Sequence, residues 1–293
     1  MVKIDRNELI NRLNQLSIWK KGDQRAPHKP LLILYAIGDM QKASHRLIPY
    51  NKAREKLKEL LVEFGPLRSS YHPEQPFVRL VNDGIWDLSE QINTSKFTNK
   101  QLIDKQISAG FKTEIYLLLK NDIQLQKEVA ETVLDAHFPE TLHEDILDSI
   151  GLDFTIGKKS SRDPKFRDRV LKAYEYRCAV CGFNVRLGNH LVGIEAAHIK
   201  WHQAGGPDTE ENGIALCSLH HKLFDRGIFT INHDRKFLVS EYANGGDGFE
   251  EWVMKYHGQS VRNPVQHYYV PNDSFLGWHV KEVFKGPSRY IVN

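Results

Sequence analysis

The sequence has no long hydrophobic run and very little cysteine. No apolar stretch approaches the roughly 18 residues of a membrane-spanning helix, so we expect no α-helical membrane span. The first residues are charged and lack the apolar core of a secretory signal, so we expect no export. The chain has only three cysteines, all between residues 178 and 217 at metal-ligand spacing, and none is left over for a disulfide. Together these features predict a protein of the reducing cytoplasm.

Net charge is also small, and internal repeats are lacking. Lys and Arg number 40 against 37 Asp and Glu, so the formal net charge is only +3. That balance does not by itself indicate a nucleic-acid partner, but it permits one if the basic residues cluster. The 293 residues, 41% hydrophobic and 26% charged, are typical of a soluble globular protein long enough for two domains.

Residues 1–154 are expected to form a mixed α/β domain. Helical spacing of apolar residues, helix-capping residues and turn signals define its elements. The expected elements are a helix over 5–19 capped by Asp5, an apolar helix that Pro30 opens and that reaches Met40, an amphipathic helix over 51–64, a loop over 65–76, a strand hairpin formed by 77–80 and 85–88 around Asn82-Asp83-Gly84, and two or three further helices ending near residue 139.

A second domain is expected over residues 164–293. The small, polar and basic residues 155–163 predict an interdomain linker. Asp163-Pro164 predicts a helix start, and the helix continues through the apolar positions of residues 166–176. The tail over residues 275–284 is expected to pack as an apolar closing element. The predicted fold class is therefore α+β, with two domains.

The cysteines belong to a run of metal-binding and catalytic residue types. Two knuckles, Cys178-x-x-Cys181 and Cys217-x-x-His220, can together complete tetrahedral coordination of one ion. His221 and Asp225 are four residues apart on a predicted helix, so they share a face and can share a second ion. Because successive residues of a helix are about 100° apart, His220 points away from His221 and towards the ion of the two knuckles.

This arrangement resembles the HNH endonucleases, with their ββα-metal core, over about residues 165–240. The resemblance implies a structural Zn²⁺ in the two knuckles, His198 as the general base that activates water, and Asn212 as the residue that pins the loop carrying His198. It also implies a catalytic Mg²⁺ or Mn²⁺ held by His221 and Asp225. Oxygen ligands and a phosphate suit those hard ions, and sulfur suits zinc.

One position departs from the HNH pattern. Many family members have a metal-binding Asp or His directly before the base, where this chain has Ala197. Glu195 lies on the same strand face and could bind the ion directly or support another ligand. The competing interpretation is a structural zinc ribbon, for which the catalytic residue types would be superfluous. Three other histidines lack motif positions and are expected in loops or on the surface: His190, His202 and His233.

The N-terminal half carries a second set of motifs. Arg25-Ala-Pro-His28-Lys29-Pro, Ser69-Ser70-Tyr71-His72-Pro73-Glu-Gln-Pro76 and Gly84-Ile-Trp86 resemble, over about residues 5–150, the sulfur-binding domain of type IV restriction endonucleases that cut phosphorothioated DNA. The resemblance implies an apolar cup for sulfur formed by residues 71–76 and a charged clamp at Arg25. His28, Lys29 and Ser70 are expected nearby. His72 and Pro76 stand where the family commonly has Tyr and Ala.

Without this resemblance, the prolines of these motifs would be interpreted as ordinary loop residues. Trp86 is expected in the core.

The leading interpretation is a type IV restriction endonuclease that binds double-stranded phosphorothioated DNA. A second interpretation keeps the nuclease but reads another mark, such as a methylated base. A third is a zinc-stabilised DNA-binding regulator with an inactive HNH fold. A duplex break by a single-site nuclease needs two active sites, so symmetry favours a homodimer.

Overall fold

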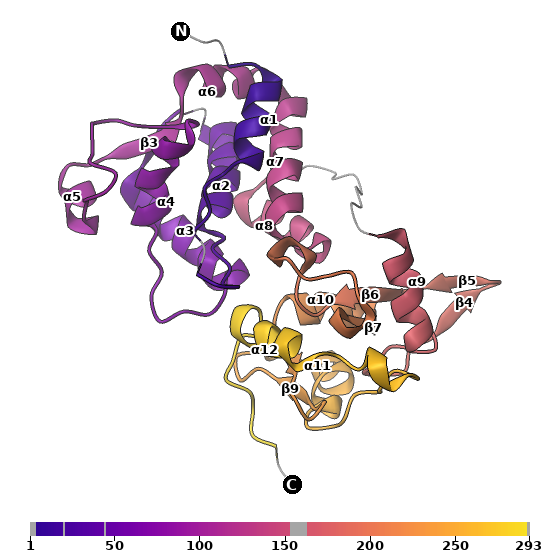
Figure 1. The fold of residues 1–293 in the computed structure, drawn as a ribbon. Coiled ribbons are helices and arrows are strands. Elements are labelled where there is room, and N and C mark those ends of the chain that lie inside the picture. The colour runs from indigo at the N-terminus through magenta and orange to yellow at the C-terminus, as the bar shows by residue number, and fades with distance from the viewer. Residues whose placement is uncertain (1–3, 20, 44, 153–162, 292–293) are drawn as a thin grey trace. The chain divides into compact units, whose positions relative to one another are not determined.

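The computed structural model describes residues 4–19, 21–43, 45–152 and 163–291. The chain divides into two compact units, Met1–Gly157 and Lys158–Asn293 (Figure 1). The predicted linker over 155–163 lies outside the described residues except for Asp163. Both units mix helices and strands, as the predicted α+β class requires. No helix in the described part of the chain is long and apolar enough to span a membrane.

The N-terminal unit is built around helix α2. Its residues from Pro30 to Met40 are all buried, because helices pack on several of its faces. Figure 1 shows α1, α2 and α7 side by side. The helices and strands are α1 (Arg6–Asn14), α2 (His28–Ala43), β1 (Ile48–Pro49), α3 (Tyr50–Phe64), α4 (Glu74–Arg79), β2 (Trp86–Leu88), α5 (Asn99–Asp104), β3 (Ser108–Phe111), α6 (Thr113–Lys120), α7 (Ile123–His137) and α8 (His143–Ile150). The strands form one antiparallel sheet in the order β1-β3-β2.

The predicted hairpin over residues 77–88 is wrong. Phe77 and Val78 lie in α4, and the chain continues into a 3₁₀ turn (Leu80–Asp83). Gly84 has a φ of 73°, so the Asn-Asp-Gly signal ends this helical segment as a left-handed cap. Phe77, Val78 and Leu80 are buried side chains of a short helix, and so short an apolar run does not distinguish helix from strand. Strand β2 pairs instead with β3, Trp86 opposite Phe111.

The first helix is shorter than predicted. Asp5 caps α1 by accepting a hydrogen bond from the Glu8 amide, as expected, but the helix ends at Asn14. Trp19 therefore lies in the following loop and is 57% exposed, although its spacing suggested the apolar face of the helix. Trp86 is fully buried, as predicted, and its indole donates to the Phe77 carbonyl at 3.0 Å.

The C-terminal unit has a ββα centre. Strand β6 (Ile194–His198) pairs antiparallel with β7 (Gly213–Cys217), and α10 (Ser218–Asp225) follows β7 directly. Helix α9 (Pro164–Ala173) packs on both strands. The remaining elements are β4 (Val185–Leu187), β5 (His190–Val192), β8 (Phe229–Ile231), β9 (Phe237–Val239), α11 (Asp247–Trp252) and α12 (Asp273–Glu282). Two hairpins, β4–β5 and β8–β9, complete the sheets.

Both ends of this unit agree with the sequence. Asp163 caps α9 by accepting a hydrogen bond from the Lys165 amide at 2.9 Å, and Pro164 occupies the first turn. The predicted closing element is helix α12, which buries Leu276 and Trp278 and packs on β8. The ββα centre is thus enclosed by α9 and α12, elements distant in the sequence.

Candidate functional site

Four side chains gather at the beginning of α10 as a candidate zinc site. Cys178 and Cys181 lie in the turn after α9, Cys217 ends β7, and His220 lies in the first turn of α10. Their ligand atoms all lie within 4.8 Å of one another, and no other such group of His, Cys, Asp or Glu occurs in the described ranges. The Cys181 and Cys217 sulfurs are 3.9 Å apart, close to the roughly 3.8 Å that tetrahedral Zn–S bonds impose.

The electrostatics of this cluster suit a divalent cation. Hydrogen bonds from Cys181 and Cys217 lower the pKa of Cys178, so one thiolate forms readily. Hydrogen bonds with Cys178 and Cys181 raise the pKa of Cys217. A second thiolate beside the first is unfavourable until a cation lies between them. His220 places Nδ1 at 3.1 Å from the Cys217 sulfur, while its Nε2 donates to the Trp252 carbonyl at 2.9 Å. That second bond fixes the tautomer that leaves Nδ1 for a metal.

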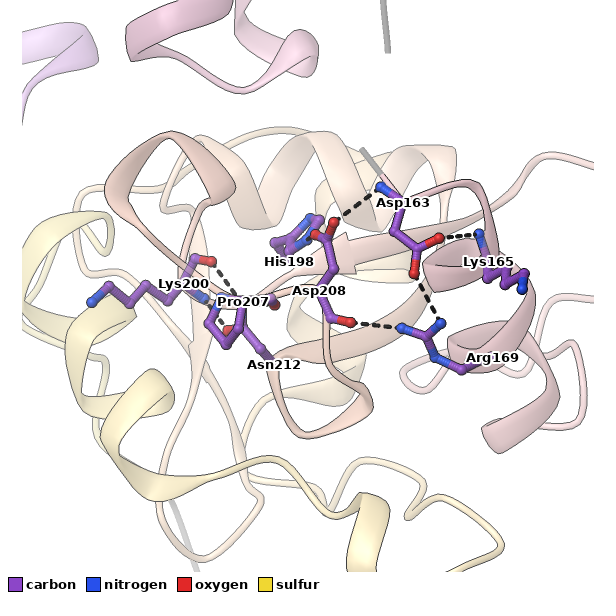
Figure 2. Close-up of polar contacts among 8 residues, drawn as sticks. All are labelled: Asp163, Lys165, Arg169, His198, Lys200, Pro207, Asp208 and Asn212. Carbon is purple, nitrogen blue, oxygen red and sulfur yellow. Dashed lines mark hydrogen bonds and ion pairs between the residues drawn. The ribbon is translucent and has the colours of Figure 1, made fainter. Parts of the chain in front are cut away.

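His198 ends strand β6 in a buried position. Its ring stacks on Phe166 with centroids 4.1 Å apart, and its Nε2 lies 2.7 Å from Asp208 Oδ1. The second oxygen of Asp208 accepts a hydrogen bond from the Asp163 amide at 3.0 Å (Figure 2). Burial alone would raise the pKa of Asp208, but these hydrogen bonds outweigh it and hold that pKa below its usual value. The ring is thus fixed both by stacking and by an ionised carboxylate.

Asn212 holds the ends of the loop that follows His198. The Asn212 side chain is fully buried. Its oxygen accepts a hydrogen bond from the backbone N–H of Lys200 at 2.8 Å, and its NH₂ group donates to the carbonyls of Lys200 and Pro207 at 2.9 and 3.0 Å (Figure 2). These three bonds satisfy backbone groups that the loop would otherwise bury unpaired. The arrangement is that of a loop clamp beside His198.

His221 lies between two carboxylates. Its Nδ1 is 2.6 Å from Glu195 Oε2, and its Nε2 is 3.2 Å from Asp225 Oδ2. Burial lowers the pKa of His221, but Asp225 and Glu195 outweigh burial and raise it to about 9. Asp225 also accepts from the Trp201 indole at 3.0 Å. One ion at Nε2 could be shared with Asp225, whereas Glu195 lies at the opposite nitrogen and suits a supporting role.

Sequence reasoning missed several residues around these histidines. Asp208, Trp201 and Phe166 contact functional side chains but belong to no spaced motif. His202 was expected in a loop or at the surface, and it lies in the segment between β6 and β7, half-buried, where its ring meets that of His198 edge-on at 5.9 Å. His190 and His233 are exposed, as expected. A carboxylate in the loop between His198 and Asn212 was the available signal for Asp208.

The N-terminal unit contains a pocket of about 790 Å³. It gathers residues from the loop before α2, the loop before α4, and the segment around residues 79–82. The predicted binding residues that line it are Arg25, His28, Lys29, Ser70, Tyr71, His72 and Pro76. Pro73 is buried and is not among the lining residues, so it supports the loop rather than the pocket wall. Unpredicted lining residues include Trp19, Gln24, Arg68, Gln75, Arg79 and Asn82.

Three polar side chains of the pocket, Lys29, His28 and Tyr71, differ in charge and in hydrogen bonding. Lys29 donates to Asp83 at 2.5 Å and to the Ser17 carbonyl at 2.7 Å, so it ties loops together and its charge is offset. Burial, with a smaller contribution from His72, lowers the pKa of His28 to about 4, which leaves the ring neutral at pH 7. The buried Tyr71 hydroxyl has no hydrogen-bond partner in the described part of the chain. A buried hydroxyl of that kind is suited to a ligand.

Taken together, the fold and these two sites define a modular DNA endonuclease: a recognition domain joined to a metal-dependent nuclease core. The family model described as "ScoMcrA-like, DNA sulfur-binding domain" matches residues 6–155, and the HNH endonuclease model matches residues 178–232. The chain belongs to the ScoMcrA-like DNA sulfur-binding domain family and also carries an HNH endonuclease domain. The recognition domain and nuclease core predicted from the sequence are therefore confirmed.

Several solved structures are similar to parts of the chain. The sulfur-binding domain of SprMcrA complexed with phosphorothioated DNA is 18% identical, with a TM-score of 0.44 over 51% of this chain and 95% of that one. The corresponding domain of ScoMcrA, also complexed with phosphorothioated DNA, is 22% identical, with a TM-score of 0.42 over 49% and 94%. The type IV phosphorothioation-dependent restriction endonuclease ScoMcrA is 22% identical, with a TM-score of 0.39 over 56% and 32%. A search of curated proteins gave no match.

Proposed function

We propose that this chain is a type IV restriction endonuclease that binds phosphorothioated double-stranded DNA and hydrolyses its phosphodiester bonds. The observation that carries the proposal is the union, in one chain, of a family-matched DNA sulfur-binding domain with a family-matched HNH endonuclease domain. In the latter, His221 lies beside Asp225, and Asn212 bonds to the loop that follows His198. Sulfur enters a DNA backbone when it replaces a non-bridging phosphate oxygen. A domain that binds DNA sulfur would therefore direct the nuclease to that modification.

The pocket of the N-terminal unit supports sulfur recognition. A phosphorothioate sulfur is larger, more polarisable and less well hydrated than oxygen, so apolar walls favour it. His72 and Pro76, with the added surface of Trp19, would supply those walls. Arg25 would hold the remaining phosphate charge, with the Tyr71 hydroxyl as a further donor. Ser70 and neutral His28 would complete the polar edge, whereas Lys29 would act by fixing the loops.

The C-terminal unit supports hydrolysis by a base-activated water. His198 would take a proton from water, and the resulting hydroxide would attack the phosphorus as the 3′-oxygen leaves. Asn212 would keep the loop after His198 in place, and His221 with Asp225 would hold a Mg²⁺ or Mn²⁺ ion. That ion would polarise the scissile phosphate and stabilise the leaving oxygen. Glu195 would orient His221 through Nδ1 instead of binding the ion.

The second metal would be structural. Cys178, Cys181, Cys217 and His220 suit Zn²⁺, because three sulfurs and one imidazole at tetrahedral spacing favour it over harder ions. Thiolate ligands also favour action in a reducing cytoplasm. Two copies acting together would supply one active site for each DNA strand, so we propose a homodimer on DNA. Sedimentation of the protein with and without duplex tests that assembly.

A binding experiment tests the recognition step. His198→Ala protein, which should bind without cutting, is titrated against three duplexes of one sequence: phosphorothioated, unmodified and methylated. We expect preference for the phosphorothioated duplex. His72→Ala in the same background should reduce that preference, and Arg25→Ala should weaken all binding and flatten its salt dependence, each by about 1–3 kcal/mol.

Arg54→Ala is the matched control for Arg25, because Arg54 is an exposed arginine of α3 outside the pocket. It should leave both affinity and preference unchanged. Equal affinity for all three duplexes would contradict sulfur recognition, and preference for the methylated duplex would assign the domain to another mark.

A further inference from the structure

A loop carboxylate with no assigned role lies against the proposed base. Asp208 is at the end of the turn-rich segment between His198 and Asn212, and its Oδ1 lies 2.7 Å from His198 Nε2. Its side chain is only 19% exposed, so the contact is partly shielded from water. Because an ionised carboxylate only accepts hydrogen bonds, His198 must donate through Nε2. A neutral imidazole with its proton on Nε2 carries its lone pair on Nδ1.

The carboxylate is itself held by a closed set of contacts from helix α9. The Asp163 amide donates to Asp208 Oδ2 at 3.0 Å, and Arg169 donates to the Asp208 carbonyl at 2.6 Å. Arg169 also donates to the Asp163 carboxylate at 3.0 Å, which closes the set (Figure 2). Oδ2 and the main-chain carbonyl of Asp208 are therefore fixed from the first turns of α9, and Oδ1 is left for His198. Since Phe166 of the same helix stacks on His198, α9 sets both the plane and the tautomer of the ring.

We propose that Asp208 is a positioning residue for His198: it keeps the proton on Nε2, so that Nδ1 is the atom that accepts the proton of water. The proposal rests on the hydrolytic function proposed above, and it names an atom within that site. In this role Asp208 contacts neither the reacting water nor the DNA. It acts through His198, and the imidazolium that forms during the reaction is stabilised by the adjacent carboxylate.

The titratable groups around His198 make this testable by pH. In the described part of the chain, Asp208 and His202 face the imidazole, and Asp163, Arg169 and Glu210 lie behind Asp208. A carboxylate at hydrogen-bond distance raises the pKa of a histidine. Asp208→Asn should therefore lower the pKa of the base. Its amide can also turn its NH₂ group to Nε2, which would favour the unproductive tautomer.

The first experiment compares Asp208→Asn with Glu210→Gln in single-turnover cleavage of a phosphorothioated duplex in Mn²⁺. Asp208→Asn should lower the cleavage rate on the order of 100-fold at unchanged DNA affinity, and it should move the acid limb of the pH profile down by about one unit. Glu210→Gln removes a carboxylate that contacts Arg169 and not His198. It should stay within about twofold of wild type with an unmoved limb.

The second experiment does not depend on cleavage. Imidazole ¹⁵N shifts of wild-type protein, with His198 assigned by its absence in His198→Ala, should show a protonated Nε2 and an unprotonated Nδ1 above the titration. The reverse tautomer would overturn the proposal, as would Asp208→Asn protein with wild-type rate and pH profile. If wild-type protein cuts no DNA at all, the hydrolytic proposal fails, while the ¹⁵N shifts of wild-type and Asp208→Asn protein, compared with each other, still decide whether Asp208 sets the tautomer.

Discussion

Each histidine with a proposed function in the C-terminal domain is fixed by partners at more than one place on its ring. His198 is stacked on Phe166 and bonded at Nε2, His220 contacts a cysteine sulfur and the Trp252 carbonyl, and His221 has a carboxylate at each nitrogen. Rings held in this way lose little further freedom when a metal or substrate arrives. The surrounding loops and helices therefore preorganise the three histidine rings.

The Tyr71 hydroxyl provides a residue-scale prediction with opposite effects on the free and bound protein. Because this buried hydroxyl has no partner in the described residues, Tyr71→Phe should leave the free energy of unfolding equal or raise it by up to about 1 kcal/mol. The same change should weaken binding of phosphorothioated duplex by about 1 kcal/mol if DNA supplies the missing partner. Chemical denaturation and fluorescence anisotropy give the two values. A variant that loses stability and keeps its affinity would remove Tyr71 from the binding site.

Some functional residues could be predicted from the sequence because secondary structure fixes their spacing. His221 and Asp225 share a helix face, and the two knuckles flank a strand pair, so the structure brings each set together. Asp208 could not be identified in this way, because an irregular loop gives no period from which to infer a contact. Lys29 lay within a basic motif, but its pairing with Asp83 depends on tertiary packing.

At the scale of elements, short apolar segments were the main source of error. The residues from Phe77 to Leu80 alternate too briefly to separate a strand from a helical turn, and the glycine that follows serves both as a hairpin signal and as a helix cap. Longer periodic elements were predicted well: α3 spans Tyr50–Phe64 against the expected 51–64. The strand pairing β2–β3 joins residues far apart in the sequence, which no local pattern could indicate.

The four proposed zinc ligands lie in the turn after α9, in β7 and in α10, so their loss should unfold the C-terminal domain. Cys217→Ser removes a ligand between β7 and α10, and the binding energy of such an ion is folding energy. We expect about one tightly bound zinc per wild-type chain and a loss of the C-terminal unfolding transition in the variant, measured by metal analysis and calorimetry. Chelation followed by Zn²⁺ readdition is the control, with Mg²⁺ unable to restore the transition. A folded, zinc-free and active variant would refute the ligand set.

Helix α7 gives the N-terminal domain a sensitivity to acid. Burial lowers the pKa of His137 to about 4, so the unfolded chain, with a histidine pKa near 6.5, binds a proton before the folded one does. The stability contributed by the neutral ring is therefore present above about pH 6.5 and is lost as pH falls towards 4. His137→Phe should flatten the decline of unfolding free energy between pH 6.5 and 4.5, whereas exposed His190→Asn should not. An unchanged slope in His137→Phe would contradict this origin of the acid sensitivity.

At the scale of the whole molecule, the chain separates recognition from chemistry. The pocket lies in the unit Met1–Gly157, and the residues proposed as metal ligands and as the base lie in the unit Lys158–Asn293. Changes in one unit should therefore alter one step and spare the other: Arg25→Ala should impair binding without loss of zinc, and His198→Ala should impair cleavage without loss of DNA affinity. Composition alone could not indicate this division, because a net charge of +3 conceals where the cations gather.

The most direct test of the central claim is cleavage of two plasmids of identical sequence, one phosphorothioated and one not, by wild-type protein in Mg²⁺ or Mn²⁺. Cutting of the phosphorothioated plasmid alone, abolished by His198→Ala with zinc and folding intact, is the result we predict. Equal cutting of both plasmids would contradict the role of the N-terminal domain in recognising sulfur. No cutting of either plasmid by zinc-loaded, DNA-binding protein would contradict the assignment of a restriction endonuclease.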